Sequence, residues 1–234
     1  MDIPAARWYP AIAVRHSRRI FDSNPLEAGI VSHLGEVCRE FRPFDGVRTE
    51  LVLESPDRIF KGAVGPYGKV KGAPALIAFV GDATDPHVNE KLGYIGEGIV
   101  LEATAMDLGT CWVGGFFRKS VAAKVLRIGR REKVFAVTPV GRAVDGATLE
   151  ERTMKAFARS HQRRSLDELV DRSALEQAPV WVKSALEAAR VAPSAVNRQP
   201  WRFRLGPDRI TVSVDRPRFE LGISKRLDLS LIHI

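Results

Sequence analysis

Hydrophobic and polar positions along the first part of the chain recur with periods that predict both helices and strands. Residues 9–21 are expected to form a short helix that runs into a basic turn. A second helix is expected over residues 26–41, and residues 22–25 (DSNP) can cap its start. Three segments are expected to be strands, the middle one a continuous apolar run of buried-strand length: residues 49–54, 73–80 and 134–140.

The most regular helical pattern covers residues 89–108. Apolar residues recur three or four positions apart on one face, and Gly109 follows where a left-handed helix end is expected. Gly96 and Gly98 lower the helix propensity of this segment. We therefore expect other side chains to pack closely against both glycines.

A charged connector, residues 142–164, leads to a second part of the chain. There, residues 181–192 predict a helix that Pro193 ends. One face of this helix is expected to carry Trp181, Ala185, Ala188 and Ala192. Residues 203–214 alternate around a Gly-Pro-Asp turn, which predicts a β-hairpin.

Composition excludes several classes of protein. With 234 residues and 45% hydrophobic content, the chain can bury a core as one large domain or two small ones. No apolar run is long enough to span a bilayer, and the first residues lack the order of a signal peptide, so we expect no membrane partner. Cys38 and Cys111 lie far apart and without metal-site spacing, which favours a reduced cytoplasmic location and no bound metal.

The net charge of +8 and the pI near 9.8 raise the question of nucleic acid. The basic residues are dispersed, the densest cluster (residues 159–165) is short, and no nucleic-acid-binding motif accompanies them. We therefore expect no nucleic-acid partner, and a surface that favours an anionic small molecule.

Two short segments carry the candidate chemistry. In APSAVNRQPWRF, residues 192–203, Ser194, Asn197 and Gln199 could hydrogen-bond a flat heteroaromatic edge, or the loop could cap itself, with Asn197 bonding its own backbone. Near the N-terminus, cationic groups surround a hydroxyl, which suits a phosphate but also a solvated basic turn: Arg15, His16, Ser17 and Arg19. Together, the two segments describe a cofactor with a phosphate at one end and a heteroaromatic ring at the other.

Four motifs resemble those of the FMN-dependent nitroreductase family. RHSRRIFD, residues 15–22, is similar to its FMN-phosphate motif, and APSAVNRQPWRF to its flavin-contacting loop. GEGIVLEATAMDLGTCWVGGFF, residues 96–117, resembles its central helix and the glycine-bearing loop beside the flavin ring. HQRRSLDELV, residues 161–170, resembles a basic segment that also reaches the phosphate. The resemblance implies an α+β, nitroreductase-like fold with a mixed, mainly antiparallel sheet flanked by helices.

The order of the motifs departs from the common pattern, in which the flavin loop follows soon after the basic turn and two subunits share each FMN. Here residues 38–52 take that place, and the loop comes late. This order resembles the putative TM nitroreductase subgroup, in which one chain mimics a dimer. It implies a first half (residues 1–145) with the phosphate turn, a connector (146–172) and a second half (173–234) with the ring loop. A monomer with this internal pseudo-dimer is expected, and a homodimer is the alternative.

The resemblance also implies the site residues. The phosphate would be held by Arg15, His16, Ser17 and Arg19, with Arg163 or Arg164 as a fifth group. The ring would be lined from the second half by Pro193, Ser194, Ala195, Asn197 and Gln199. Its redox-active edge would lie near Val113, Gly114 and Gly115, where many relatives have an acidic residue before the glycine.

The implied chemistry belongs to the flavin, so no catalytic side chain is expected. NADH or NADPH would reduce FMN by hydride transfer, and FMN would reduce a small electron acceptor such as a nitroaromatic or a quinone. A flavin-binding protein without turnover and, less favoured, a nucleic-acid binder are the alternatives. The chain stops inside a helical pattern, and LSLIHI, residues 229–234, resembles a translated sequencing adaptor. We therefore expect the natural protein to continue differently beyond Asp228.

Overall fold

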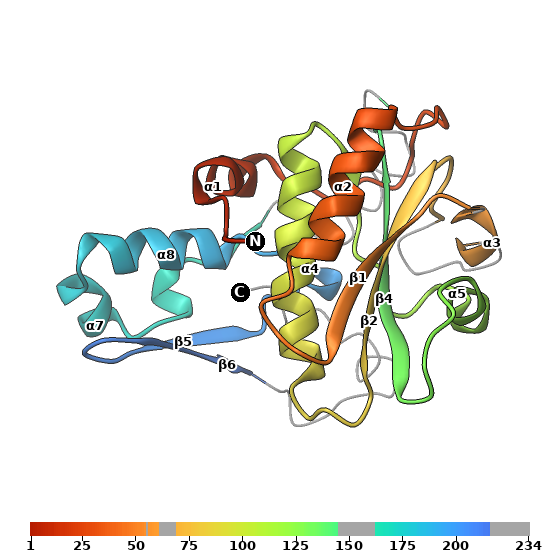
Figure 1. Cartoon of the computed structure of the whole chain (residues 1–234). Coiled ribbons are helices and arrows are strands. Elements are labelled where there is room, and N and C mark those ends of the chain that lie inside the picture. The colour runs from red at the N-terminus through yellow and green to blue at the C-terminus, as the bar shows by residue number, and fades with distance from the viewer. Residues whose placement is uncertain (55, 61–68, 145–161, 216–234) are drawn as a thin grey trace.

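A four-stranded antiparallel sheet organises the first part of the chain (Figure 1). The computed structural model describes residues 1–54, 56–60, 69–144 and 162–215. The strands stand in the order β1-β2-β4-β3. Their bounds are Val47–Val52 for β1, Ala75–Asp82 for β2, Gly109–Thr110 for β3 and Glu132–Gly141 for β4. The three predicted strands are thus confirmed as β1, β2 and β4.

Helices cover both faces of this sheet (Figure 1). On one face lie α2 (Ala28–Glu40) and α4 (Val88–Ala105), and on the other α3 (Pro56–Phe60) and α5 (Lys119–Val125). Successive side chains of a strand point to opposite faces. In β2, Ala75, Ile77 and Phe79 therefore join the α2/α4 core, and Leu76, Ala78 and Val80 join the α3/α5 core. Burial on both faces explains why this strand reads as an unbroken apolar run.

The two glycines of α4 lie where aromatic rings press against the helix. A Cβ atom on Gly96 would stand 2.3 Å from Cη2 of Trp112. One on Gly98 would stand 2.7 Å from Phe41 Cε1 and 2.8 Å from Trp8 Cη2. The predicted close packing is confirmed. Trp8 belongs to α1 (Ala5–Val14), which packs against α4 at this point.

Two expected helix boundaries are wrong. Gly109 does not end α4: Asp107 takes the left-handed conformation (φ 59°), and Gly109 belongs to β3. The DSNP segment does not cap α2, whose first turn follows Glu27 without a side-chain cap. Asp22 instead folds back on Asn24, accepting from its backbone N–H at 2.9 Å, because short polar side chains readily form such local turns.

The expected helix over residues 9–21 is also wrong beyond Val14. The chain from Arg15 onward runs extended along the sheet, with Arg18 N donating to Thr110 O at 2.8 Å and Phe21 N donating to Lys71 O at 3.0 Å. These long-range partners satisfy the backbone groups that a continued helix would have paired locally.

A second, smaller unit follows, at the left of Figure 1. Its helical elements are η1 (Leu166–Glu168), α7 (Arg172–Gln177), α8 (Val180–Arg190) and η2 (Ala195–Asn197). Strands β5 (Trp201–Leu205) and β6 (Ile210–Val214) form the predicted hairpin, which is confirmed. The unit has its own core of buried side chains: Leu169, Val170, Val182, Leu186, Ala192, Trp201 and Phe203.

The predicted face of α8 is wrong in phase, since Trp181 is 59% exposed while Val182 and Leu186 point inward. The helix also ends at Arg190, before Pro193 is reached. Most of the expected connector (residues 145–161) and the chain end (residues 216–234), with the expected change after Asp228, lie outside the described residues.

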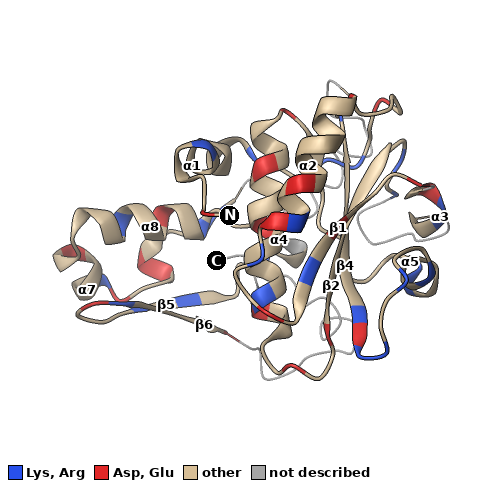
Figure 2. Ribbon diagram, in the orientation of Figure 1, with Lys and Arg blue, Asp and Glu red and all other residues tan. Residues whose placement is uncertain are grey.

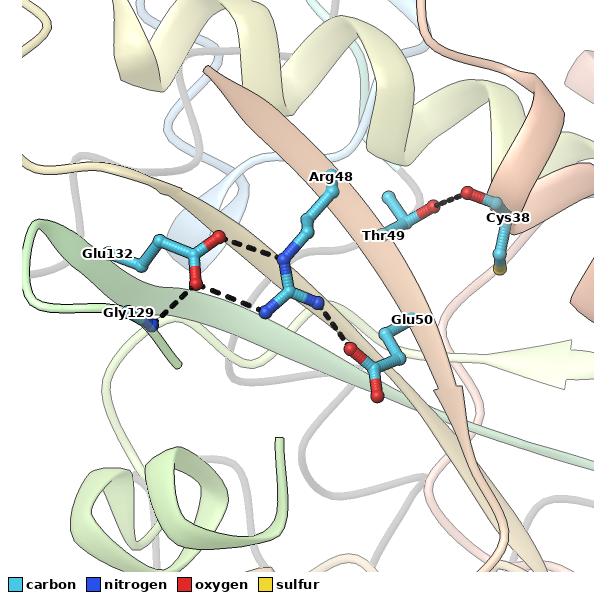
Figure 3. Close-up of polar contacts among 6 residues, drawn as sticks. All are labelled: Cys38, Arg48, Thr49, Glu50, Gly129 and Glu132. Atoms are coloured by element: carbon cyan, nitrogen blue, oxygen red, sulfur yellow. Dashed lines mark hydrogen bonds and ion pairs between the residues drawn. The ribbon is translucent and has the colours of Figure 1, made fainter. Parts of the chain in front are cut away.

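A polar network spans three strands of the sheet (Figure 3). Arg48 of β1 reaches past β2 to Glu132 of β4, with Nε 2.8 Å from Oε1 and Nη2 3.2 Å from Oε2, and it also pairs with Glu50. The hydrogen bond from Arg48 is the main cause that lowers the pKa of Glu132. Thr49 Oγ1 donates to Cys38 O at 3.1 Å and joins β1 to the end of α2. Charged contacts of Arg48 therefore join β1 to β4 across β2, and a neutral hydrogen bond joins β1 to α2.

Charged residues are spread over both units, with Lys and Arg interspersed among Asp and Glu (Figure 2). Within the described ranges, no helix combines the length and the apolar character that crossing a membrane requires.

Candidate functional site

Arg15 is an enclosed cation of the predicted phosphate turn. Its side chain is 7% exposed, and its Nε lies 3.6 Å from Oε1 of Glu97 on α4. The other carboxylate oxygen of Glu97 accepts a hydrogen bond from Trp112 Nε1 at 2.9 Å. The Arg15 side chain is therefore paired with the Glu97 carboxylate, which the Trp112 indole also binds.

Burial makes Glu97 an unusual carboxylate. Its side chain is 16% exposed, and this burial raises its pKa, against the opposing effects of the Arg15 charge and the Trp112 hydrogen bond. Desolvation disfavours the charged form of an acid. Keeping Glu97 ionised therefore costs free energy, which the Arg15 charge and the Trp112 hydrogen bond offset only in part.

The remaining residues of the turn follow on one extended segment. Successive side chains of such a segment lie on opposite sides. His16 accordingly meets Arg18, with Nε2 3.2 Å from Nη1, while the backbone of Ser17 pairs with Thr110 and that of Arg19 with Lys71. By the same alternation, we expect Arg15, Ser17 and Arg19 on one side and His16 on the other.

The predicted ring loop is bonded to the basic segment at residues 162–164. Arg163 Nη1 donates to Asn197 Oδ1 at 2.6 Å, and Asn197 Nδ2 donates to Gln162 O at 2.8 Å. Gln199 Nε2 donates to the same carbonyl at 3.1 Å, and Gln199 Oε1 accepts from Arg164 N at 2.8 Å. Both ends of the Asn197 side-chain amide thus bond the neighbouring segment.

Inside the loop, Gln199 N donates to Ser194 Oγ at 3.0 Å. Asn197 and Gln199 both take positive φ angles, 54° and 48°. Such angles are uncommon outside glycine and mark a loop that its surroundings hold in one shape. Pro193, Ser194 and Ala195 are half-buried in this arrangement.

Charged residues of both units influence the pKa of Arg163. Burial lowers its pKa first, and the positive charges of Arg15 and Arg190 lower it further. Arg15 belongs to the first unit, whereas Arg163 and Arg190 belong to the second. Guanidinium groups brought together in a poorly solvated place attract an anion, since its charge relieves their mutual repulsion. Of the two candidates for the fifth phosphate group, this favours Arg163, because the recorded contact of Arg164 is made by its backbone N–H.

The third predicted segment joins the same set of contacts. Val113 pairs with Val137 of β4, its N–H donating at 2.8 Å, and the preceding Trp112 stacks on Phe79 with ring centroids 4.4 Å apart. Through Trp112 and Glu97, the segment with Val113, Gly114 and Gly115 is therefore connected to Arg15. The phosphate turn and the Val113 segment are thus joined by contacts, and the ring loop is related to them through the effect of the Arg15 charge on Arg163.

The sequence analysis missed Glu97, Trp112 and Gln162. Glu97 did carry a signal, because a carboxylate between Gly96 and Gly98, on a helix expected to pack closely, needs a specific partner. Gln162 contributes only its carbonyl, which no side-chain pattern reveals. Among the described residues, no three His, Cys, Asp or Glu side chains gather in a way that could hold a metal ion.

Comparison with known proteins gives a family and a fold. The sequence matches the family described as putative TM nitroreductase over residues 7–231. A putative nitroreductase from Thermotoga maritima has a similar structure at 21% identity, with TM-score 0.60, covering 97% of this chain and 81% of that one. A nitroreductase family protein from Clostridium difficile is 19% identical, with TM-score 0.51, covering 68% and 94%.

A putative NADH dehydrogenase/NAD(P)H nitroreductase from Parabacteroides distasonis is 18% identical, with TM-score 0.50, covering 61% and 90%. At these identities the likeness shows the nitroreductase fold. No curated protein matches the chain.

Proposed function

Because this chain belongs to the putative TM nitroreductase family, we propose that it is an FMN-dependent oxidoreductase. NADH or NADPH would be the electron donor, and a nitroaromatic, a quinone or a similar small molecule the acceptor. The structural relative from Parabacteroides distasonis carries NAD(P)H in its name, and we extend that co-substrate to this chain as part of the proposal.

The observation that carries the proposal is a pair of partly buried arginines, one in each unit, of which Arg15 lowers the pKa of Arg163 by its positive charge. Their guanidinium groups suit a phosphate, which accepts paired hydrogen bonds from such a fork. Ser17 and Arg19 follow Arg15 on the same side of its extended segment and would add a hydroxyl and a third cation. In this proposal His16 completes the turn from the other side.

The other end of FMN would lie against the loop of the second unit. Pro193, Ser194 and Ala195 would line the ring, with Asn197 and Gln199 holding the loop in shape through residues 162–164. Val113, Gly114 and Gly115 would lie at the edge of the ring at which hydride is exchanged. The N–H of Val113 is bonded to Val137 O, so the backbone N–H groups of Gly114 and Gly115 would face that edge. When bound, FMN supplies the hydride and electron transfer, and the protein binds and orients it and adjusts its electronic properties.

The proposal includes one site per chain, built from both units of a monomer that mimics a dimer. The first unit supplies Arg15, and the second supplies the loop. A homodimer that exchanges units between chains is the alternative. Mixing a Ser17→Ala/Arg19→Ala double variant with an Asn197→Ala variant distinguishes them, since only exchange between chains restores FMN binding in the mixture.

The visible absorption spectrum tests the main proposal. Purified protein saturated with FMN and freed of excess should retain about one flavin per chain, and its absorbance should bleach on addition of NADH or NADPH under argon. Re-oxidation by a quinone or a nitroaromatic completes the cycle. Retention of flavin without bleaching by either nucleotide would instead indicate a flavin-binding protein without turnover. Failure to retain flavin would reject the FMN site altogether.

A further inference from the structure

We infer that Glu97 is a positioning residue, which orients the Arg15 guanidinium toward the phosphate of a bound ligand. The inference rests on the proposed function and concerns a residue of α4 that lies within the central-helix motif but is not among the predicted site residues. Three features of the structure carry it: the contact of Glu97 with Arg15, the hydrogen bond from Trp112 and the contrast with Glu102.

The closest contact between Arg15 and Glu97 is made at the inner nitrogen of the guanidinium. The ion pair joins Glu97 Oε1 to Nε, the inner nitrogen of the guanidinium, at 3.6 Å. The carboxylate therefore approaches the inner end of the guanidinium, whose two outer nitrogens form the pair of donors that suits a phosphate. Because the Arg15 side chain is 7% exposed, its fork has few other orientations to adopt.

Glu97 is in turn held from the side where the ring is proposed to lie. Trp112 Nε1 donates to Oε2 at 2.9 Å, and the indole is fixed by stacking on Phe79 and by the absence of a side chain at Gly96. The chain Trp112–Glu97–Arg15 therefore couples the loop at Val113 to the phosphate turn. Partners of this outer kind set the orientation of groups that contact a ligand.

Glu102, five positions later on the same helix, is a carboxylate that anchors neighbouring helices. It accepts from Trp8 Nε1 at 2.7 Å, pairs with Arg7 Nη2 at 2.9 Å and lies 2.6 Å from His33 Nε2. Glu102 thereby ties α1 and α2 to α4. The ion pair of Glu97 with Arg15 is longer, at 3.6 Å, and the raised pKa of Glu97 marks a net cost of burying its charge. A group held at such a cost contributes little to stability, which agrees with a role in binding.

The test compares FMN with riboflavin, which lacks the phosphate. Apo-protein is titrated with each flavin by fluorescence quenching, and the ratio of the two dissociation constants isolates the phosphate contribution. Glu97→Gln should lower the preference for FMN by about tenfold, the smaller end of what loss of an orienting partner costs at metal sites. Glu102→Gln, the matched control on the same helix, should lower the melting temperature and leave the ratio unchanged.

A double variant shows whether Glu97 acts through Arg15. In an Arg15→Ala background, Glu97→Gln should change the FMN-to-riboflavin ratio no further. A further loss of the same size in that background, or an unchanged ratio in folded Glu97→Gln protein, would overturn the inference and leave the proposed function standing. Should Glu97→Gln fail to fold, Trp112→Phe removes the indole donor and keeps an aromatic ring; a lowered ratio supports the inference and an unchanged one overturns it. Wild-type protein without preference for FMN over riboflavin would overturn both.

Discussion

Replacing Gly98 by alanine tests how tightly α1 is packed on α4. The added Cβ would stand 2.7 Å from Phe41 Cε1 and 2.8 Å from two atoms of the Trp8 ring, closer than such atoms approach in proteins. The two rings meet edge to face, with centroids 5.0 Å apart, and Trp8 is also bonded to Glu102, so neither can simply turn away. Overpacking of this kind costs about 1–3 kcal/mol. The better helix propensity of alanine returns about 1 kcal/mol.

We therefore expect Gly98→Ala to lower the free energy of unfolding by up to about 2 kcal/mol, or the melting temperature by a few degrees. Urea and thermal unfolding followed by circular dichroism measure this. Gly35→Ala in α2 is the matched control, because there the nearest atom to the new Cβ is the flexible end of Arg39 at 3.3 Å. The control should be neutral or slightly stabilising. If both variants were stabilised alike, α1 would not be packed against α4 as described.

Three further outcomes are expected. Arg163→Ala should weaken FMN binding by about 1.5–3 kcal/mol in a fluorescence titration, while Arg164→Ala, the adjacent control, should change it little; equal losses would remove the distinction between them. Burial raises the folded-state pKa of Glu97 above its ordinary 4.5, so the folded chain holds this proton more tightly than the unfolded chain does. The stability that protonated Glu97 contributes is therefore full below pH 4.5 and is lost as the pH rises through the folded-state pKa. In urea unfolding at a series of pH values, wild type should lose stability relative to Glu97→Gln across that window. Parallel curves of stability against pH would contradict this. Burial raises the pKa of the Cys38 thiol to about 11, so Cys38 should escape alkylation at pH 8 in native protein and react once urea unfolds it, as mass spectrometry would show; rapid labelling of native protein would mean that this core opens.

Patterns that depend on local periodicity were predictable from the sequence. The apolar run that became β2 and the period of α4 are both set by burial against neighbours, and burial leaves its mark on every residue of the element. The two α4 glycines were predictable for the same reason, since a helix keeps such residues where something packs closely.

Features set by distant partners were not predictable. The segment after Val14 is extended because Thr110 and Lys71 bond to its backbone, and no residue pattern within the segment predicts these partners. The phase of α8 is set by the face that packs on the rest of the second unit, which buries Val182 and Leu186 and leaves Trp181 exposed. In the candidate site, the cations and amides were visible as residue types, whereas the bond from Arg163 to Asn197 joins positions that only folding brings together.

The separate core of the second unit has a consequence for cooperativity. Among the described residues, none is shared between the cluster around Leu186 and the two clusters that flank the sheet. Apolar burial alone therefore gives the two units little reason to unfold together, and the like charges of Arg15 and Arg163 oppose their association. A ligand that neutralises both charges stabilises only the assembled form. On this reasoning an anionic cofactor would stabilise the association of the two folding units. The cellular concentration of that cofactor would then influence how long the intact protein survives proteolysis.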